Sequence, residues 1–275
     1  MKTIIVATDF SPESGNAVEY AAGFAQKTGA RIILFNSFTI PLHVANTMLP
    51  AEALDHLIEE NKILLKEKCE AVARKFSIDV KYEAELMVEV SEELERLYKK
   101  YDADLIVMGM AGNSVAQDIF GNTTTSAIMK HSYPVLAIPE KVKFDEIKNI
   151  LFAYDELKEG KHEISAKVKE IADFFSAKIE VFHVQPKPEE NCSREIEEEF
   201  KESEYEFKEV KSEEIIKEIE SEIKKLPADM LVMIPQKYNF WESLVHRSKT
   251  RMMASRSSVP VLSIPLLSPQ GEGGV

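Results

Sequence analysis

The octapeptide SYPVLAIP at residues 132–139 returns almost unchanged as SVPVLSIP at residues 258–265. Each copy holds a short, almost wholly apolar run, which is typical of a strand that is buried on both faces of a parallel sheet. A repeat of such long period with only two copies indicates tandem domains rather than a solenoid. The octapeptide therefore predicts a duplicated α/β domain.

Three further pairs of segments correspond in the same order along the chain. They are IIVATDF (4–10) with ILFAYDE (150–156), GARIILFNSF (29–38) with SAKIEVFHVQ (176–185), and YDADLIVMGM (101–110) with LPADMLVMIP (226–235). The first pair is offset by 146 positions and the octapeptide by 126, so the second copy is 20 residues shorter. We predict domains at residues 1–141 and 146–267, followed by a flexible tail at 268–275.

Strand-like and helix-like patterns alternate within each copy. Residues 13–27 have helical spacing, with Ser11 and Pro12 as the start signal and Gly29 as the end. A long amphipathic helix, a strand at VKYEAEL and a helix capped by Ser91 follow. Because strand–helix alternation requires crossover connections, each copy is predicted to be a Rossmann-like, five-stranded parallel open sheet flanked by helices.

The second copy contains a segment rich in Glu and Lys at residues 184–226. Its isoleucines recur at helical spacing, at Ile215, Ile219 and Ile223. This pattern predicts a solvated amphipathic helix without a special role.

Composition excludes several classes of function. The net charge of −13 disfavours a nucleic-acid binder, which needs a surplus of Lys and Arg. Neither the two cysteines nor the six histidines have the spacing of metal ligands. The apolar run at the amino terminus is too short for a signal peptide, and no later apolar run is long enough to span a membrane. We expect a cytoplasmic protein with neither nucleic-acid nor membrane partners.

The glycine-spaced stretch GMAGNSVAQDIFGNTTTS at residues 109–126 follows the apolar run of the fourth strand. Ligands of open α/β sheets lie beyond the carboxyl ends of the strands, where neighbouring connections diverge. Asp9 ends the first strand and Gly109 the fourth, so we expect both beside such a point. Gly109 and Gly112 allow backbone N–H groups to approach an anion closely.

The end of the same stretch suits a phosphate as well. Gly121 precedes a predicted helix, at whose start Asn122, Thr123 and Thr124 could donate hydrogen bonds alongside free N–H groups. A tight turn followed by an ordinary helix cap explains the same residues without a ligand. Both interpretations stay open on the pattern alone.

The segments VATDFS, DLIVMGMAG and GNTTT with SYPVLAIP together resemble the universal stress protein family, and the resemblance spans both halves. It implies the adenine nucleotide alpha hydrolase-like form of the Rossmann-like fold and a stress-response protein that binds ATP or another adenine nucleotide. The resemblance implies that Asp9 hydrogen-bonds the nucleoside, with Thr8 and Ser37 beside it. The glycine loop, directly after Met108, would hold the phosphates.

The loop departs from the family pattern in two places. ATP-binding members carry G-x2-G-x9-G followed by Ser or Thr, whereas eight residues separate Gly112 from Gly121 here, and Asn122 takes the hydroxyl position. No Lys or Arg lies between Gly109 and Ile128, so backbone dipoles, hydroxyls and, where present, Mg²⁺ would meet the phosphate charge. No general base is evident, so we assign no catalytic residue and at most slow ATP hydrolysis.

The second copy has no glycine at the corresponding place. Pro235 stands at the first glycine position, and a basic cluster of His246, Arg247, Lys249 and Arg251 follows. This cluster is either an anion site or a solvated or interface face. We therefore expect one nucleotide site per chain, in the first domain. The alternative is a protein-interaction or signalling module in which both sites are degenerate.

The resemblance also concerns assembly. In the family the strands that correspond to PVLAIP and PVLSIP pair across a dimer, which implies an internal pseudo-dimer here. An apolar edge strand left bare is an aggregation hazard, which gives this pairing a physical reason. A further homodimer and an unidentified protein partner are left open.

Overall fold

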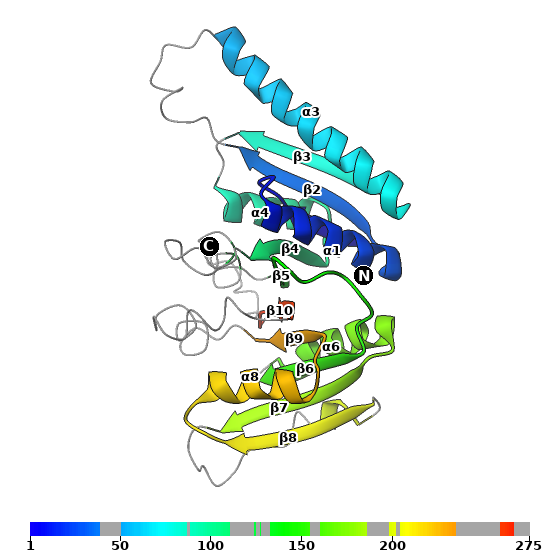
Figure 1. The fold of residues 1–275 in the computed structure, drawn as a ribbon, viewed down its shortest axis with the longest axis vertical. Helices are drawn as coiled ribbons and strands as arrows, with labels where there is room; N and C mark the ends of the chain where they lie inside the picture. Colours follow the sequence, from blue (N-terminus) through cyan, green and yellow to red (C-terminus); the bar gives the residue numbers. More distant parts are fainter. Residues whose placement is uncertain are drawn as a thin grey trace, which may run out of the picture.

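A computed structural model gives the fold of the chain (Figure 1). The residues that it describes are 1–38, 51–86, 89–110, 124, 127, 133–154, 160–185, 198–201, 204–234 and 259–266. Gly112, Gly121, Asn122 and Thr123 lie outside these ranges, as do the basic cluster and Pro235.

Helices and strands alternate as the sequence predicts. The amino-terminal half contains β1 (Thr3–Ala7), α1 (Pro12–Thr28), β2 (Arg31–Phe38), α3 (Ala51–Phe76), β3 (Val80–Leu86), α4 (Val90–Lys100), β4 (Leu105–Met110) and β5 (Val135–Pro139). The carboxyl-terminal half contains β6 (Asn149–Tyr154), α6 (Lys161–Phe175), β7 (Lys178–Gln185), β8 (Tyr205–Lys211), α8 (Ile215–Lys225), β9 (Met230–Met233) and β10 (Val261–Ser263).

The strands form a ten-stranded sheet in the order β3-β2-β1-β4-β5-β10-β9-β6-β7-β8. All pairings within each half are parallel, and β5 and β10 join the halves antiparallel, with Leu136 opposite Leu262. The mostly parallel, helix-flanked α/β fold is thus confirmed. Because the sheet is twisted, the outer strands of both halves point to the same side in Figure 1.

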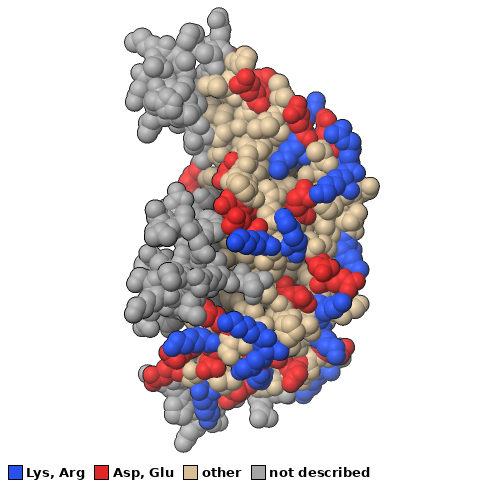
Figure 2. All heavy atoms as spheres, viewed as in Figure 1, with Lys and Arg blue, Asp and Glu red and all other residues tan. Residues whose placement is uncertain are grey.

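Helices cover both faces of this sheet. One cluster of buried residues includes side chains of α1, α3 and α6, whereas the cluster on the other face includes side chains of α4 and α8. The inner strands β1, β4 and β5 are almost wholly apolar, since each is buried on two faces. On the described part of the face in Figure 2, Lys and Arg are interspersed with Asp and Glu.

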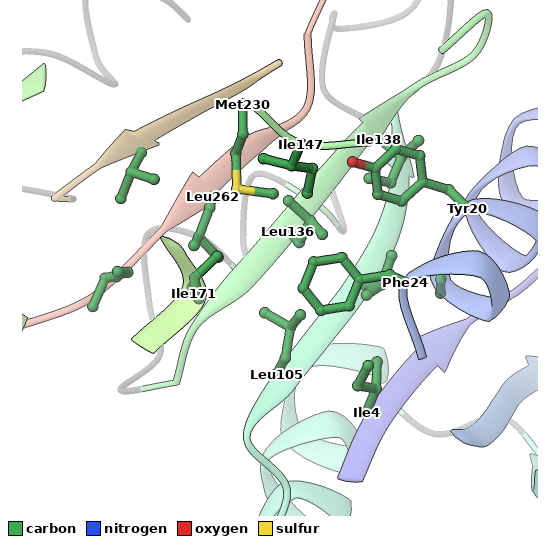
Figure 3. Packing of buried hydrophobic residues seen from close by; sticks show 14 of the residues in the cluster. Ile4, Tyr20, Phe24, Leu105, Leu136, Ile138, Ile147, Ile171, Met230 and Leu262 are labelled. Atoms are coloured by element: carbon green, nitrogen blue, oxygen red, sulfur yellow. The ribbon is translucent and has the colours of Figure 1, made fainter. Parts of the chain in front are cut away.

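The two halves share one core where the central strands meet. Figure 3 shows Tyr20 and Phe24 of α1 beside Leu136 of β5, close to Leu262 of β10. Phe144, in the connection between the halves, contacts the Tyr20 ring edge-on, with the ring centroids 5.2 Å apart. Phe24 of α1 also packs against Phe175 of α6, with the ring centroids 5.0 Å apart, so aromatic packing holds α1 against the second half.

Two local predictions are wrong. Residues 205–211 form strand β8, which pairs with β7, so the single helix expected over 184–226 is interrupted by a strand and α8 begins only at Ile215. The N-cap of α4 is Glu89, whose side chain accepts a hydrogen bond from the Glu92 N–H, and Ser91 is buried inside the first turn. A carboxylate can accept this bond as a serine hydroxyl does, so the sequence pattern did not separate the two.

Candidate functional site

The connection from β1 to α1 is short and tightly turned. Ser11 is the N-cap of α1 with extended backbone, and its Oγ accepts a hydrogen bond from the Ser14 N–H at 3.2 Å. Phe10 has a φ of 64°, a left-handed conformation that is uncommon outside glycine. This turn places Asp9 at the carboxyl end of β1, directly before the start of a helix.

The Asp9 side chain is exposed but firmly held. Its Oδ1 accepts hydrogen bonds from the Ser11 hydroxyl at 2.6 Å and from the Ser11 N–H at 3.0 Å. Burial raises the pKa of the Asp9 carboxyl, but hydrogen bonds from Ser11 and Ser14 lower it by more, and the pKa lies below its ordinary value. Asp9 is therefore an ionised hydrogen-bond acceptor at neutral pH.

Thr8 is engaged inside the protein. Its buried hydroxyl lies 3.0 Å from the Ser14 hydroxyl, and its carbonyl oxygen accepts a hydrogen bond from Asn36 Nδ2 at 2.6 Å. Ser37, the next residue on β2, is half-buried. Thr8 thus supports the turn beneath Asp9 instead of offering its hydroxyl outward.

Gly109 has a packing reason to be glycine. It lies in β4, and a Cβ there would come within 2.7 Å of the Glu13 carbonyl oxygen and 2.9 Å of the Ser14 nitrogen. The first turn of α1 therefore rests directly on the Gly109 backbone. Met108 is buried on the other face of the sheet. Gly109 was predicted to let backbone N–H groups approach a phosphate, but in the structure it has to be glycine so that the first turn of α1 can pack against β4.

Thr124, further along the chain, also contacts Gly109. It is buried, and its hydroxyl donates a hydrogen bond to the Gly109 carbonyl oxygen at 3.2 Å. Because Ser14 touches Gly109 and also bonds the Asp9 backbone, the structure links Asp9, Gly109 and Thr124. Of the glycine-spaced stretch 109–126, only Gly109, Met110 and Thr124 fall within the described residues.

The corresponding positions of the second half carry different side chains. Tyr154 stands where the first half has Thr8, and His183 where it has Asn36. The His183 Nδ1 lies 3.2 Å from the Tyr154 carbonyl oxygen, so the cross-strand contact of Asn36 is kept. The two rings pack at 5.0 Å, and both residues are buried. Aromatic side chains thus take the place of a hydroxyl and an amide.

Sequence reasoning missed the roles of Ser14 and Asn36. The Ser14 hydroxyl contacts the Thr8 hydroxyl, the Asp9 N–H and the Ser11 carbonyl oxygen. The Asn36 side chain donates to the Thr8 carbonyl oxygen and so bonds β2 to the turn. The signal for Asn36 was its alignment with His183 in the repeat, since both are polar residues within an apolar strand. Nothing in the local pattern distinguished Ser14 from an ordinary helix residue.

Other features give no competing site of clear chemistry. In the described ranges no group of three or more His, Cys, Asp or Glu is arranged to hold a metal ion. No described helix is long and apolar enough to cross a membrane. A cleft of about 680 Å³ lies at the opposite, amino-terminal edge of the sheet, between Lys2, Arg31, Asp79 and Asp102.

Comparison with known proteins identifies relatives. The model of a family described as the universal stress protein family matches residues 1–139. A universal stress protein from Archaeoglobus fulgidus DSM 4304 is 18% identical, with 96% of each chain covered and a TM-score of 0.71. A structure from Pseudomonas aeruginosa UCBPP-PA14, also assigned to that family, is 14% identical over 96% of this chain and 93% of its own, with a TM-score of 0.56. A search of curated proteins returned no match. At these identities the two structures support the fold alone.

Proposed function

The chain belongs to the universal stress protein family, and we propose that its amino-terminal half binds ATP or another adenine nucleotide, at one site per chain. The observation that carries the proposal is the ionised, exposed Asp9 carboxylate at the carboxyl end of β1, beside the start of α1. This is where open α/β sheets bind ligands. A carboxylate there suits the hydrogen-bond donors of a nucleoside.

The surroundings of Asp9 fit this ligand. Gly109 and Thr124 approach from the neighbouring strand β4 and the segment after it, the side from which the phosphate loop was predicted. Mg²⁺, when it accompanies the phosphates, needs few protein ligands because it keeps several waters. The proposed function is nucleotide binding, with at most slow ATP hydrolysis, in a cytoplasmic stress-response protein.

We also propose that the second half is a degenerate copy of the same domain, with bounds of 1–141 and 146–267 for the two copies. The mirrored strand order about the β5–β10 pair supports an internal pseudo-dimer. Tyr154 and His183 fill the positions of Thr8 and Asn36 with rings, which supports a single nucleotide site.

Calorimetry on matched aspartate variants tests the site. ATP with Mg²⁺ is titrated into wild type, Asp9→Asn and Asp155→Asn, the last being the equivalent change in the second copy. We expect one ATP per wild-type chain. Asp9→Asn should weaken binding about tenfold or more, since a hydrogen bond to a charged group is lost. Asp155→Asn should bind like wild type.

Three results would contradict the proposal. Two sites per chain, or equal losses in both variants, would show that the halves are equivalent. No heat with ATP, ADP or AMP, together with no nucleotide in the mass spectrum of denatured native protein, would favour the interaction module.

A further inference from the structure

We propose that Ser11 is a positioning residue for the ligand of this site, holding one oxygen of the Asp9 carboxylate so that the other accepts hydrogen bonds from the nucleoside. This inference rests on the proposed function and names how its main contact is prepared. Two separate donors of Ser11, the hydroxyl at 2.6 Å and the N–H at 3.0 Å, converge on Oδ1.

The turn makes this convergence possible. Phe10 adopts the left-handed conformation, which folds the backbone so that the Ser11 N–H points back at Asp9. Ser11 at the same time caps α1, so the helix fixes the serine and the serine fixes the carboxylate. Both donors lie on Oδ1 and the side chain stays exposed, so Oδ2 keeps its capacity to accept from a ligand.

An exposed aspartate without such support would sample several rotamers and lose that freedom on binding. Holding it in advance removes this entropic cost. The bonds also favour the ionised form, because both donate to negative charge. Asp9 should therefore remain a pure acceptor in mildly acidic solution, and the site should select ligands that present donors.

Burial and nearby hydrogen bonds make the leading contributions to the pKa of Asp9. Burial raises the pKa of Asp9, and the groups that lower it are the hydroxyls of Ser11 and Ser14 and the N–H groups of Ser11 and of Asp9 itself. None of these leading contributions comes from a charged side chain. A change in its titration on mutation of Ser11 then reports the hydroxyl hydrogen bonds of this turn, because the Ser11 hydroxyl contacts both Asp9 and Ser14.

The test compares Ser11→Gly with Ser11→Thr in the full chain. Glycine removes the hydroxyl but is a tolerable N-cap, whereas threonine keeps both hydroxyl and cap. In nucleotide-free protein, the ¹³C carboxyl signal of Asp9 should titrate at higher pH in Ser11→Gly and as in wild type in Ser11→Thr. Calorimetry with ATP from pH 4.5 to 7.5 should show binding by Ser11→Gly about fivefold to tenfold weaker at pH 7. Its acidic loss of affinity should begin at higher pH.

Each outcome decides something different. If wild type binds no nucleotide, the proposed function and this inference both fail. If wild type binds and Ser11→Gly has the same affinity and pH profile, the role of Ser11 is overturned while the proposed function stands. A loss of affinity equal at every pH, with an unchanged Asp9 titration, would also overturn it, because fraying of α1 alone produces that result.

Discussion

Gly109→Ala tests whether the first glycine of the predicted phosphate loop is needed for packing. The added methyl would lie 2.7 Å from the Glu13 carbonyl oxygen, 2.8 Å from the Glu13 carbonyl carbon and 2.9 Å from the Ser14 nitrogen. All three are backbone atoms at the start of α1, so no side chain can turn aside. The helix itself must move away from β4, or the strand must bend.

The size of the effect follows from two opposing contributions. Overpacking a well-packed site by one methyl costs roughly 1–3 kcal/mol. Replacing glycine within a strand returns about 0.5–1 kcal/mol, because alanine loses less backbone freedom on folding. We expect a net loss of about 1–2 kcal/mol in the free energy of unfolding. For a chain of this size that corresponds to a fall of about 2–8 °C in Tm.

Gly15→Ala is the matched control on the same helix. The nearest atom to its added methyl is Lys68 Nζ at 3.9 Å, so the methyl fits and the helix gains about 0.5–1 kcal/mol. Urea denaturation followed by circular dichroism measures both variants against wild type. If Gly109→Ala is as stable as wild type, or gains stability as Gly15→Ala should, α1 does not rest on Gly109 as described.

Two further predictions concern the core and a buried acid. Gly23→Ala would place a methyl 2.5 Å from Phe144 Cδ1 and 2.9 Å from its Cγ, so it should cost about 1–2 kcal/mol of unfolding free energy. That cost should largely vanish in a Phe144→Ala background, which lacks both atoms, and equal costs in the two backgrounds would contradict the contact. Glu180 is buried with no hydrogen bond to its Oε1 from the described residues, and burial together with the charge of Glu222 raises its pKa. A carboxyl group whose pKa is raised in the folded protein costs stability as pH rises above its ordinary pKa, and the cost is complete above the raised pKa. Glu180→Gln should therefore gain about 1 kcal/mol at pH 7 and little at pH 4, measured by denaturation at both values, and no gain at pH 7 would refute the prediction.

The strands that the repeat pointed to were predictable because their patterns are local. A run such as LIVM in β4 is apolar throughout and has to be buried on both faces. The start of α1 was readable for the same reason, since Ser11, Pro12 and the following spacing are adjacent in sequence. Strand β8 was not, because its Glu and Lys residues hide the alternation. Pairing with the free edge of β7 makes it a strand, and no local pattern reports that edge.

The candidate site, too, could be predicted only in part from the sequence. The sequence alone determined that four pairs of segments in the two halves correspond, that the fold is α/β, and that Asp9 follows a buried strand beside a glycine stretch. Only the tertiary structure decided that Gly109 receives the first turn of α1 and that Thr8 bonds inward. It also placed both Ser11 donors on one carboxylate oxygen. Local patterns report which residues must be buried, whereas close approach and hydrogen-bond direction depend on segments that meet only after folding.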